Sequence, residues 1–125
     1  MGEDRRSMLK ALRSTMAPEE MLAARAALAQ IHVSERLIDY VHALVLASRQ
    51  NSLFQEGMSP RAAIALVQAS RAWAALEGRD HVIPEDVQAI LIPVTAHRLR
   101  PVKSSGGSAL ASRDLVAQMM KSVTV

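Results

Sequence analysis

Gly57-Met58-Ser59-Pro60-Arg61-Ala62 opens the stretch of sequence that decides the fold, and Glu77-Gly78-Arg79-Asp80 closes it. Ser59 predicts a helix N-cap, because its hydroxyl can accept a hydrogen bond from a free backbone N–H group, and Pro60 suits the first helical position. Arg61 then lies in the first turn, at the positive end of the helix dipole, where a cation is mildly disfavoured. A positive helix end with an additional arginine can hold an anion, above all a phosphate. The alternative is that Arg61 simply points into water, as most surface arginines do.

The residues between these two motifs predict one long helix with an apolar stripe of small side chains. The stripe consists of Ala62, Ala65, Leu66, Ala69, Trp73 and Leu76. So many alanines on one face allow a neighbouring helix to approach closely. We interpret Trp73, the only tryptophan, as a core anchor and Gly78 as the left-handed residue that ends the helix.

Start signals of the same kind recur along the chain. Ala17-Pro18-Glu19-Glu20 and Ile83-Pro84-Glu85-Asp86 each place a proline and two acids at a helix start, and Ser34 predicts the cap of a third helix. Just before Ser34, the β-branched residues of Ile31-His32-Val33 predict an extended segment. Pro93 predicts a bend or an end in the helix that starts at Pro84.

The apolar faces expected in these other helices follow helical spacing. They are Met21, Ala24, Leu28 and Ile31; Leu37, Val41, Leu44, Val45 and Ser48; Val87, Ile90, Leu91 and Val94; and Leu115, Val116, Met119, Met120 and Val123. Phe54, in the loop before the central helix, is expected to plug the bundle. Residues 103–108 are typical of a flexible linker, and residues 109–121 predict a C-terminal amphipathic helix.

Composition favours an all-α fold. Of the 125 residues, 50% are hydrophobic but only 2% are aromatic, so the core must be aliphatic. Strands prefer β-branched and aromatic residues, whereas alanine, leucine and methionine favour helices. We therefore predict a small bundle of four to five helices over residues 17–125, preceded by an N-terminal arm over residues 1–16.

Several kinds of chemistry are excluded for this chain on its own. It has no cysteine, hence no disulfide and no zinc–thiolate site, and it has no phosphate-binding P-loop, nucleophile elbow or H-E-x-x-H zinc motif. The net charge of +3 is mild, with basic residues gathered only near Arg98, Arg100 and Lys103, which argues against nucleic acid as a partner. No apolar run is long enough to span a membrane and no signal peptide is visible, as expected for a cytoplasmic protein.

Single residues that invite a functional interpretation also have a plainer one. His32 and His42 lack further ligands at metal-site spacing, so we interpret them as structural. Glu85 and Asp86 point about 100° apart on a helix, so they are partners of the helix dipole rather than a catalytic pair. Arg49 either balances the C-terminal dipole of its own helix or reaches a neighbouring segment.

Taken in order, these motifs resemble the C-terminal lid subdomain of MoxR-type AAA+ ATPases. The resemblance covers residues 33–99 and is carried by Val33-Ser34, Leu37-Ile38-Asp39-Tyr40-Val41, Leu44-Val45, Ala47-Ser48-Arg49, Gly57-Met58-Ser59-Pro60-Arg61-Ala62, Ala69-Ser70-Arg71-Ala72-Trp73-Ala74, Leu76-Glu77-Gly78-Arg79-Asp80, Val82-Ile83-Pro84-Glu85-Asp86-Val87 and His97-Arg98-Leu99. The G-x-S-P-R-A and E-G-R-D-x-V-x-P-E-D-V runs are its specific part. Ile83 departs from the family, which commonly has a hydroxyl residue there to cap the helix.

The resemblance implies a helical lid that packs over a nucleotide bound by a separate α/β ATPase core. By its place in the motif, Arg61 is similar to the family's sensor 2 arginine, which contacts the γ-phosphate of ATP and couples hydrolysis to lid movement. The implied cofactors are ATP and Mg²⁺, which this chain alone cannot hold. The implied partners are the AAA+ core of the same polypeptide, the neighbouring subunits of a ring, commonly a hexamer, and a von Willebrand factor A domain protein. Such proteins are thought to act as chaperones that remodel partners or insert metal cofactors, and on this resemblance we expect the chain to be a fragment of a longer ATPase.

Two other classes of protein stay open. A long helix, the turn at Gly78-Arg79-Asp80-His81-Val82 and the next helix start also resemble half of a histone fold, although a DNA-binding protein should show a clustered basic surface. A plain protein-interaction bundle is the other class, and it gives Arg61 no part in any ATPase activity.

Overall fold

The computed structural model describes residues 4–102 and 109–125, and the regular elements in these ranges are six α-helices. The helices are α1 (Arg5–Ala11), α2 (Pro18–Ala29), α3 (Glu35–Gln50), α4 (Pro60–Leu76), α5 (Pro84–Thr95) and α6 (Ala109–Ser122). The predicted all-α class is confirmed, and α6 falls where the C-terminal helix was expected. The predicted linker over residues 103–108 lies outside the described residues.

Helix α4 begins and ends as its sequence predicts. The Ser59 hydroxyl accepts a hydrogen bond from the backbone N–H of Ala62 at 3.1 Å, and Pro60 occupies the first helical position. At the other end Gly78 has a φ of +74°, a left-handed conformation that only glycine adopts at little cost. Ser34 caps α3 in the same way, because its hydroxyl accepts from the N–H of Leu37 at 3.2 Å.

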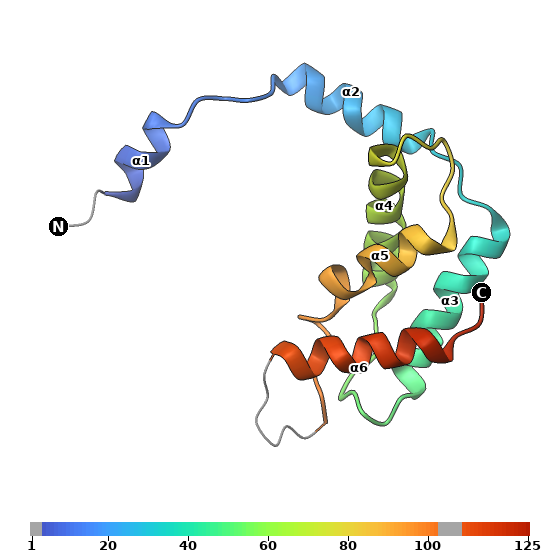
Figure 1. The fold of residues 1–125 in the computed structure, drawn as a ribbon. Coiled ribbons are helices and arrows are strands. Elements are labelled where there is room, and N and C mark those ends of the chain that lie inside the picture. Colours follow the sequence, from blue (N-terminus) through green and yellow to red (C-terminus); the bar gives the residue numbers. More distant parts are fainter. Residues whose placement is uncertain (1–3, 103–108) are drawn as a thin grey trace.

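The hydrophobic core lies between α3, α4, α5 and α6. The most extensive helix–helix contact is between α4 and α5, and α6 packs across α5 and α3 (Figure 1). The core side chains are Leu37, Tyr40, Val41, Leu44, Val45, Phe54, Met58, Ala62, Leu66, Ala74, Val82, Val87, Ile90, Leu91, Leu99, Val116 and Met119. Apart from Tyr40 and Phe54 they are aliphatic or methionine, as composition predicts, and the predicted faces of α3, α5 and α6 all contribute to them.

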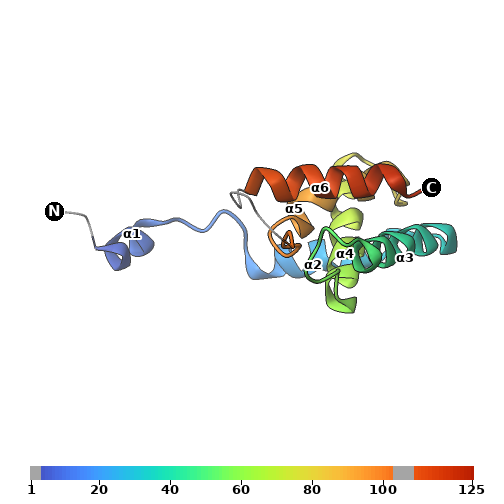
Figure 2. The same cartoon turned by 90° about the horizontal axis from the view of Figure 1, so that it is seen from below.

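The N-terminal helices lie outside this core. In the described ranges α1 contacts no other helix and stands away from the rest of the molecule, whereas α2 contacts α4 (Figures 1 and 2). Neither helix has a fully buried residue. The apolar stripe predicted for α2 is therefore mostly open, since Met21 and Ala24 are exposed and Leu28 is only half-buried.

The buried stripe of α4 differs from the predicted one. Ala62, Leu66, Ser70 and Ala74 are buried, at a constant spacing of four residues. Trp73 is 40% exposed and Leu76 82% exposed, so the prediction of a Trp73 core anchor is wrong. A four-residue step turns a helix by about 40° more than a full circle, so a line of such residues drifts around the helix. At the C-terminal end of α4 the buried line has drifted away from the side that carries Trp73 and Leu76.

The connecting segments are fixed by backbone pairing. His32 pairs with His81 in a parallel bridge, in which the His32 N–H donates to the Asp80 carbonyl at 2.8 Å and the Val82 N–H donates to the His32 carbonyl at 2.9 Å. The extended segment predicted around His32 is thus confirmed, and it ties the α2–α3 connection to the α4–α5 turn.

Two predictions for single residues, Phe54 in its loop and Pro93 in α5, have different outcomes. Phe54 is 5% exposed, as the plug interpretation predicts, and it forms an antiparallel bridge with Pro101. Helix α5 does not end at Pro93 but continues to Thr95. The proline removes one hydrogen bond of this helix, the one that its N–H would have donated to the Ala89 carbonyl.

Candidate functional site

The loop before α4 is fastened to the last turn of α3. The Ser48 hydroxyl accepts a hydrogen bond from the Met58 N–H at 2.8 Å, and Arg49 Nε donates to the Met58 carbonyl at 3.0 Å. A Cβ on Gly57 would lie 2.6 Å from the Cα of Arg49, so only glycine permits this approach. Arg49 therefore reaches a neighbouring segment, which is the second of its two predicted functions, and the glycine of the G-x-S-P-R-A motif is explained by close packing.

Arg61 follows this fastened loop directly. It lies in the first turn of α4, its side chain is exposed, and that turn contains no acidic residue. Within the described ranges the ion pairs join Arg79 to Asp86 and His81 to Asp80, so Arg61 has no anionic partner there. Pro60 has no N–H group and that of Ala62 is bound to Ser59, which leaves the N–H of Arg61 itself as the one in this turn that an anion could use. The N-terminus of α4 therefore combines a free guanidinium group with the positive end of a helix dipole, an arrangement suited to an anion.

An apolar groove runs beside this helix end, between α3 and α4. It has a volume of about 580 Å³, and it is lined by Ile38, Val41, His42, Val45, Arg49, Pro60, Ala63, Ile64, Val67, Gln68 and Arg71. Pro60, in the first turn of α4, lines the groove, and Arg49 and Arg71 are the arginines in its lining. The Nε of Arg71 is buried without a hydrogen-bond partner. His42 contributes to a groove wall and joins no metal-ligand cluster, since the described residues contain none.

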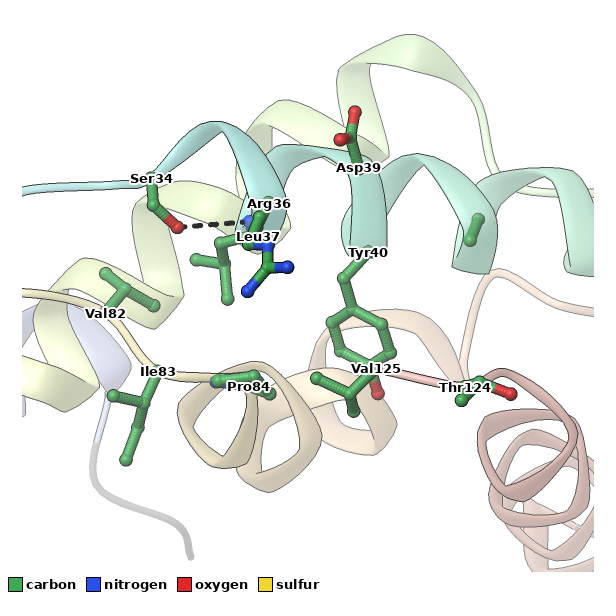
Figure 3. A pocket seen from close by; sticks show the side chains of 11 residues that line it. Ser34, Arg36, Leu37, Asp39, Tyr40, Val82, Ile83, Pro84, Thr124 and Val125 are labelled. Atoms are coloured by element: carbon green, nitrogen blue, oxygen red, sulfur yellow. Dashed lines mark hydrogen bonds between the residues drawn. The ribbon is translucent and has the colours of Figure 1, made fainter.

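A second hollow of about 690 Å³ lies between the start of α3, the segment before α5 and the last residues of the sequence (Figure 3). The Tyr40 ring forms one wall, and its hydroxyl accepts a hydrogen bond from Gln88 Nε2 at 3.2 Å. Arg36 and Asp39 supply the charges at this hollow, and the rest of its lining is largely apolar. A single carboxylate offers no acid–base pair, so we assign no chemistry to this hollow.

Asp86 is a structural residue. It is 1% exposed, it pairs with Arg79, and its Oδ2 accepts a hydrogen bond from the Ile83 N–H at 2.9 Å. Glu85 is exposed, so the two neighbouring acids do not share a site. The Asp86 carboxylate thereby holds the start of α5, where Ile83 has no capping side chain. This pairing explains why the E-G-R-D and P-E-D-V runs occur together.

A smaller electrostatic contact lies at the same turn. His81 Nδ1 is 2.8 Å from Asp80 Oδ1, and this hydrogen bond holds the pKa of Asp80 below its ordinary value of 3.8. Both side chains are exposed, and neither touches Arg61 or the groove beside α4.

The fold and this site together define a class of protein. Residues 46–118 match the family model of the AAA lid domain, which is more than half of the chain, so the chain belongs to the AAA lid domain family. Its relatives identify it as a MoxR-type AAA+ lid. It is 55% identical over 47 residues to Protein MoxR of Paracoccus denitrificans, in an alignment that covers 38% of this chain and 14% of that protein. It is 38% identical over 76 residues to Chaperone MoxR1 of Mycobacterium tuberculosis, covering 54% of this chain and 20% of that protein.

Two comparisons cover nearly the whole chain. The uncharacterized protein YeaC of Bacillus subtilis is 27% identical over 117 residues, which are 94% of this chain and 37% of YeaC. The crystal structure of a candidate ATPase from Cytophaga hutchinsonii superposes with a TM-score of 0.77 and 26% identity, over 99% of this chain and 44% of that one. The chain thus spans less than half the length of each of these relatives. The family membership favours the lid over the histone-fold-like alternative.

No helix in the described part of the chain is both long and apolar enough to cross a membrane.

Proposed function

We propose that this chain is the lid of a longer AAA+ ATPase and that Arg61 is its sensor 2 residue. The observation that carries the proposal is the position of Arg61: an exposed guanidinium without an anionic partner in the first turn of a capped helix, in a chain of the AAA lid family. Lid closure would bring this end of α4 to ATP bound by the core, where Arg61 contacts the γ-phosphate. Hydrolysis removes that contact and allows the lid to move, which couples turnover to remodelling of a partner protein.

The remaining components belong to the rest of the polypeptide and its assembly. The core supplies the P-loop, Mg²⁺ and the attacking water, since this chain has neither a P-loop nor, in its described part, a cluster of metal ligands. By similarity to the MoxR relatives, the whole protein forms a ring, commonly a hexamer, that acts as a cytoplasmic chaperone or inserts cofactors, with a von Willebrand factor A domain protein as partner. A relative named as a chaperone supports this part of the proposal.

The test is Arg61→Ala in the full-length polypeptide. We expect the kcat for ATP hydrolysis to fall about ten- to a hundredfold, because a hydrogen bond to a charged group is worth about 1.5–3 kcal/mol. Arg113→Ala, which removes an exposed arginine on α6, is the matched control and should leave kcat unchanged. Circular dichroism should show that both variants keep their helices. Equal turnover in the two variants would remove the sensor 2 assignment and would favour a plain interaction bundle.

A further inference from the structure

We infer that Ser48 and Arg49 are positioning residues for Arg61, and that they lock the N-terminus of α4 to α3 so that the guanidinium is presented in one orientation. This inference rests on the proposed function of Arg61. We call the three residues Ser48, Arg49 and Met58 the α3–α4 latch.

Ser48 is placed to hold the loop rather than only to fill space. It is 1% exposed, and its hydroxyl donates to the Val45 carbonyl at 2.7 Å. A serine hydroxyl has a single hydrogen to donate, so this bond within α3 fixes its direction. The lone pairs that remain accept the Met58 N–H at 2.8 Å, and the bond is buried. A buried N–H group is costly to leave without a partner, so the loop is held firmly at this point.

Arg49 binds the backbone carbonyl of Met58, the residue whose N–H is bound by Ser48. Its Nε donates to the Met58 carbonyl at 3.0 Å, so both the N–H and the carbonyl of Met58 are bound to consecutive residues of α3. The Met58 side chain is 2% exposed and belongs to the core. Gly57 lies flush against the Arg49 backbone, since a Cβ there would be 2.7 Å from the Arg49 nitrogen. Met58 is therefore fixed by its main chain, its side chain and its neighbour.

Little freedom is left between Met58 and Arg61. Ser59 is held by its capping bond to Ala62, and the ring of Pro60 fixes its own φ. The backbone of Arg61 consequently has its position set by α3 as well as by α4. When the lid moves, the first turn of α4 and the last turn of α3 should move as one body. A phosphate contact is sensitive to such placement, because a displacement of about 1 Å can cost a hundredfold in rate.

The alternative is that the latch only stabilises the bundle, and the chain offers a matched control for it. Ser70 is also a fully buried serine, and its hydroxyl donates to the Leu66 carbonyl at 2.8 Å, within its own helix. Its hydrogen bond stays inside α4, whereas that of Ser48 also reaches the loop. Ser70→Ala thus removes a buried hydroxyl without touching the latch.

The experiment is a double-mutant cycle in the full-length ATPase, with kcat and KM for ATP as readouts. Ser48→Ala and Arg49→Ala should each lower kcat about five- to thirtyfold in the wild-type background, as expected for the loss of a contact worth about 1–2 kcal/mol. Neither should lower it further when Arg61 is already alanine, because the latch acts through that side chain. Arg49→Lys, which keeps a donor, should recover part of the rate. Ser70→Ala should leave kcat within about twofold of wild type.

Different results overturn different claims. If Arg61→Ala lowers kcat but Arg49→Ala lowers it by the same factor in both backgrounds, the latch is only structural and the inference fails while the proposed function stands. If Arg61→Ala has no effect, the proposed function fails, and the inference fails with it. Arg49 is an exposed side chain, so its variants keep the test available should Ser48→Ala not fold. Hydrogen exchange gives an independent readout: Ser48→Ala should speed exchange at residues 57–62, and Ser70→Ala should not.

Discussion

At the scale of single residues, two buried polar side chains make contacts that the sequence does not predict. Ser48 and Asp86 are both almost fully buried, and each binds a backbone group at the start of a helix. Buried polar groups are costly unless they are paired, so these two residues fix where α4 and α5 begin. The bond from Ser48 spans ten residues of sequence and the Arg79–Asp86 pair spans seven across a turn, and no helical periodicity reveals such contacts.

Loss of the Asp86 carboxylate should destabilise the chain strongly. Asp86→Ala leaves Arg79 without its partner and the Ile83 N–H without its acceptor, and breaking a buried pair in this way costs about 3–5 kcal/mol. Equilibrium unfolding in urea, followed by circular dichroism, measures the change in the free energy of unfolding. Glu85→Ala, at the exposed neighbouring position, should change it by less than about 0.5 kcal/mol. A similar small change for Asp86→Ala would show that the pair contributes nothing net.

The Asp80–His81 contact should make the stability of the fold depend on pH. The pKa of the Asp80 carboxyl is lowered in the folded chain. The contact therefore stabilises the fold above pH 3.8, and this stabilisation is lost as the pH falls through the lowered pKa of Asp80. An NMR titration of the Asp80 carboxyl carbon should have its midpoint below 3.8 in the wild type and nearer to 3.8 in His81→Ala. The same midpoint in both proteins would mean that His81 is not the cause of the shift.

At the scale of the elements, the ends of the helices are more predictable than their buried faces. Ser34, Ser59 and Gly78 act through bonds or dihedral angles within a few residues, which is why the sequence predicts their functions correctly. Burial on α4 depends instead on how that helix crosses α5, and this crossing is a property of the packed bundle. Helical spacing, which predicts Trp73 as a core anchor, does not contain this crossing, and Trp73 is 40% exposed in the structure. The position of Arg61 in the first turn was predictable from its local motif, but its attachment to α3 was not.

The buried line of α4 can be tested by paired leucine substitutions. Leu66 is fully buried, so Leu66→Ala should lower the free energy of unfolding by about 2–5 kcal/mol, through lost transfer energy and the cavity that remains. Leu76 is 82% exposed, so Leu76→Ala in the same chain should cost less than about 0.5 kcal/mol. Urea unfolding of the two variants side by side gives both values. Equal costs would place Leu76 in the core and contradict the drift of the buried line.

At the scale of the whole molecule, the distribution of exposed apolar side chains indicates contact with a partner outside this chain. The exposed large hydrophobic side chains before α3 are Met8, Leu9, Leu12, Met16, Met21 and Leu22. They gather on α1, on α2 and between them, and these two helices contain no buried residue. Exposed apolar side chains in such number mark an interaction site. The crystal structure from Cytophaga hutchinsonii matches 99% of this chain, hence also α1 and α2, but only 44% of its own length is matched. On the function proposed above, we expect the rest of the longer polypeptide to cover these helices.

Hydrogen exchange should show directly whether the rest of the polypeptide packs against α1. A short helix such as α1, with no tertiary contact to another helix in the described structure, is marginal in water, so its amides should exchange almost freely in this chain alone. In the full-length polypeptide the same amides should be protected, because their apolar side chains are then packed. The segment around Leu66 in α4, which is buried here, serves as the control and should be protected in both proteins. Equally fast exchange of residues 5–11 in the two proteins would mean that α1 stays open beside the core. The contact between the lid and the core would then not include α1.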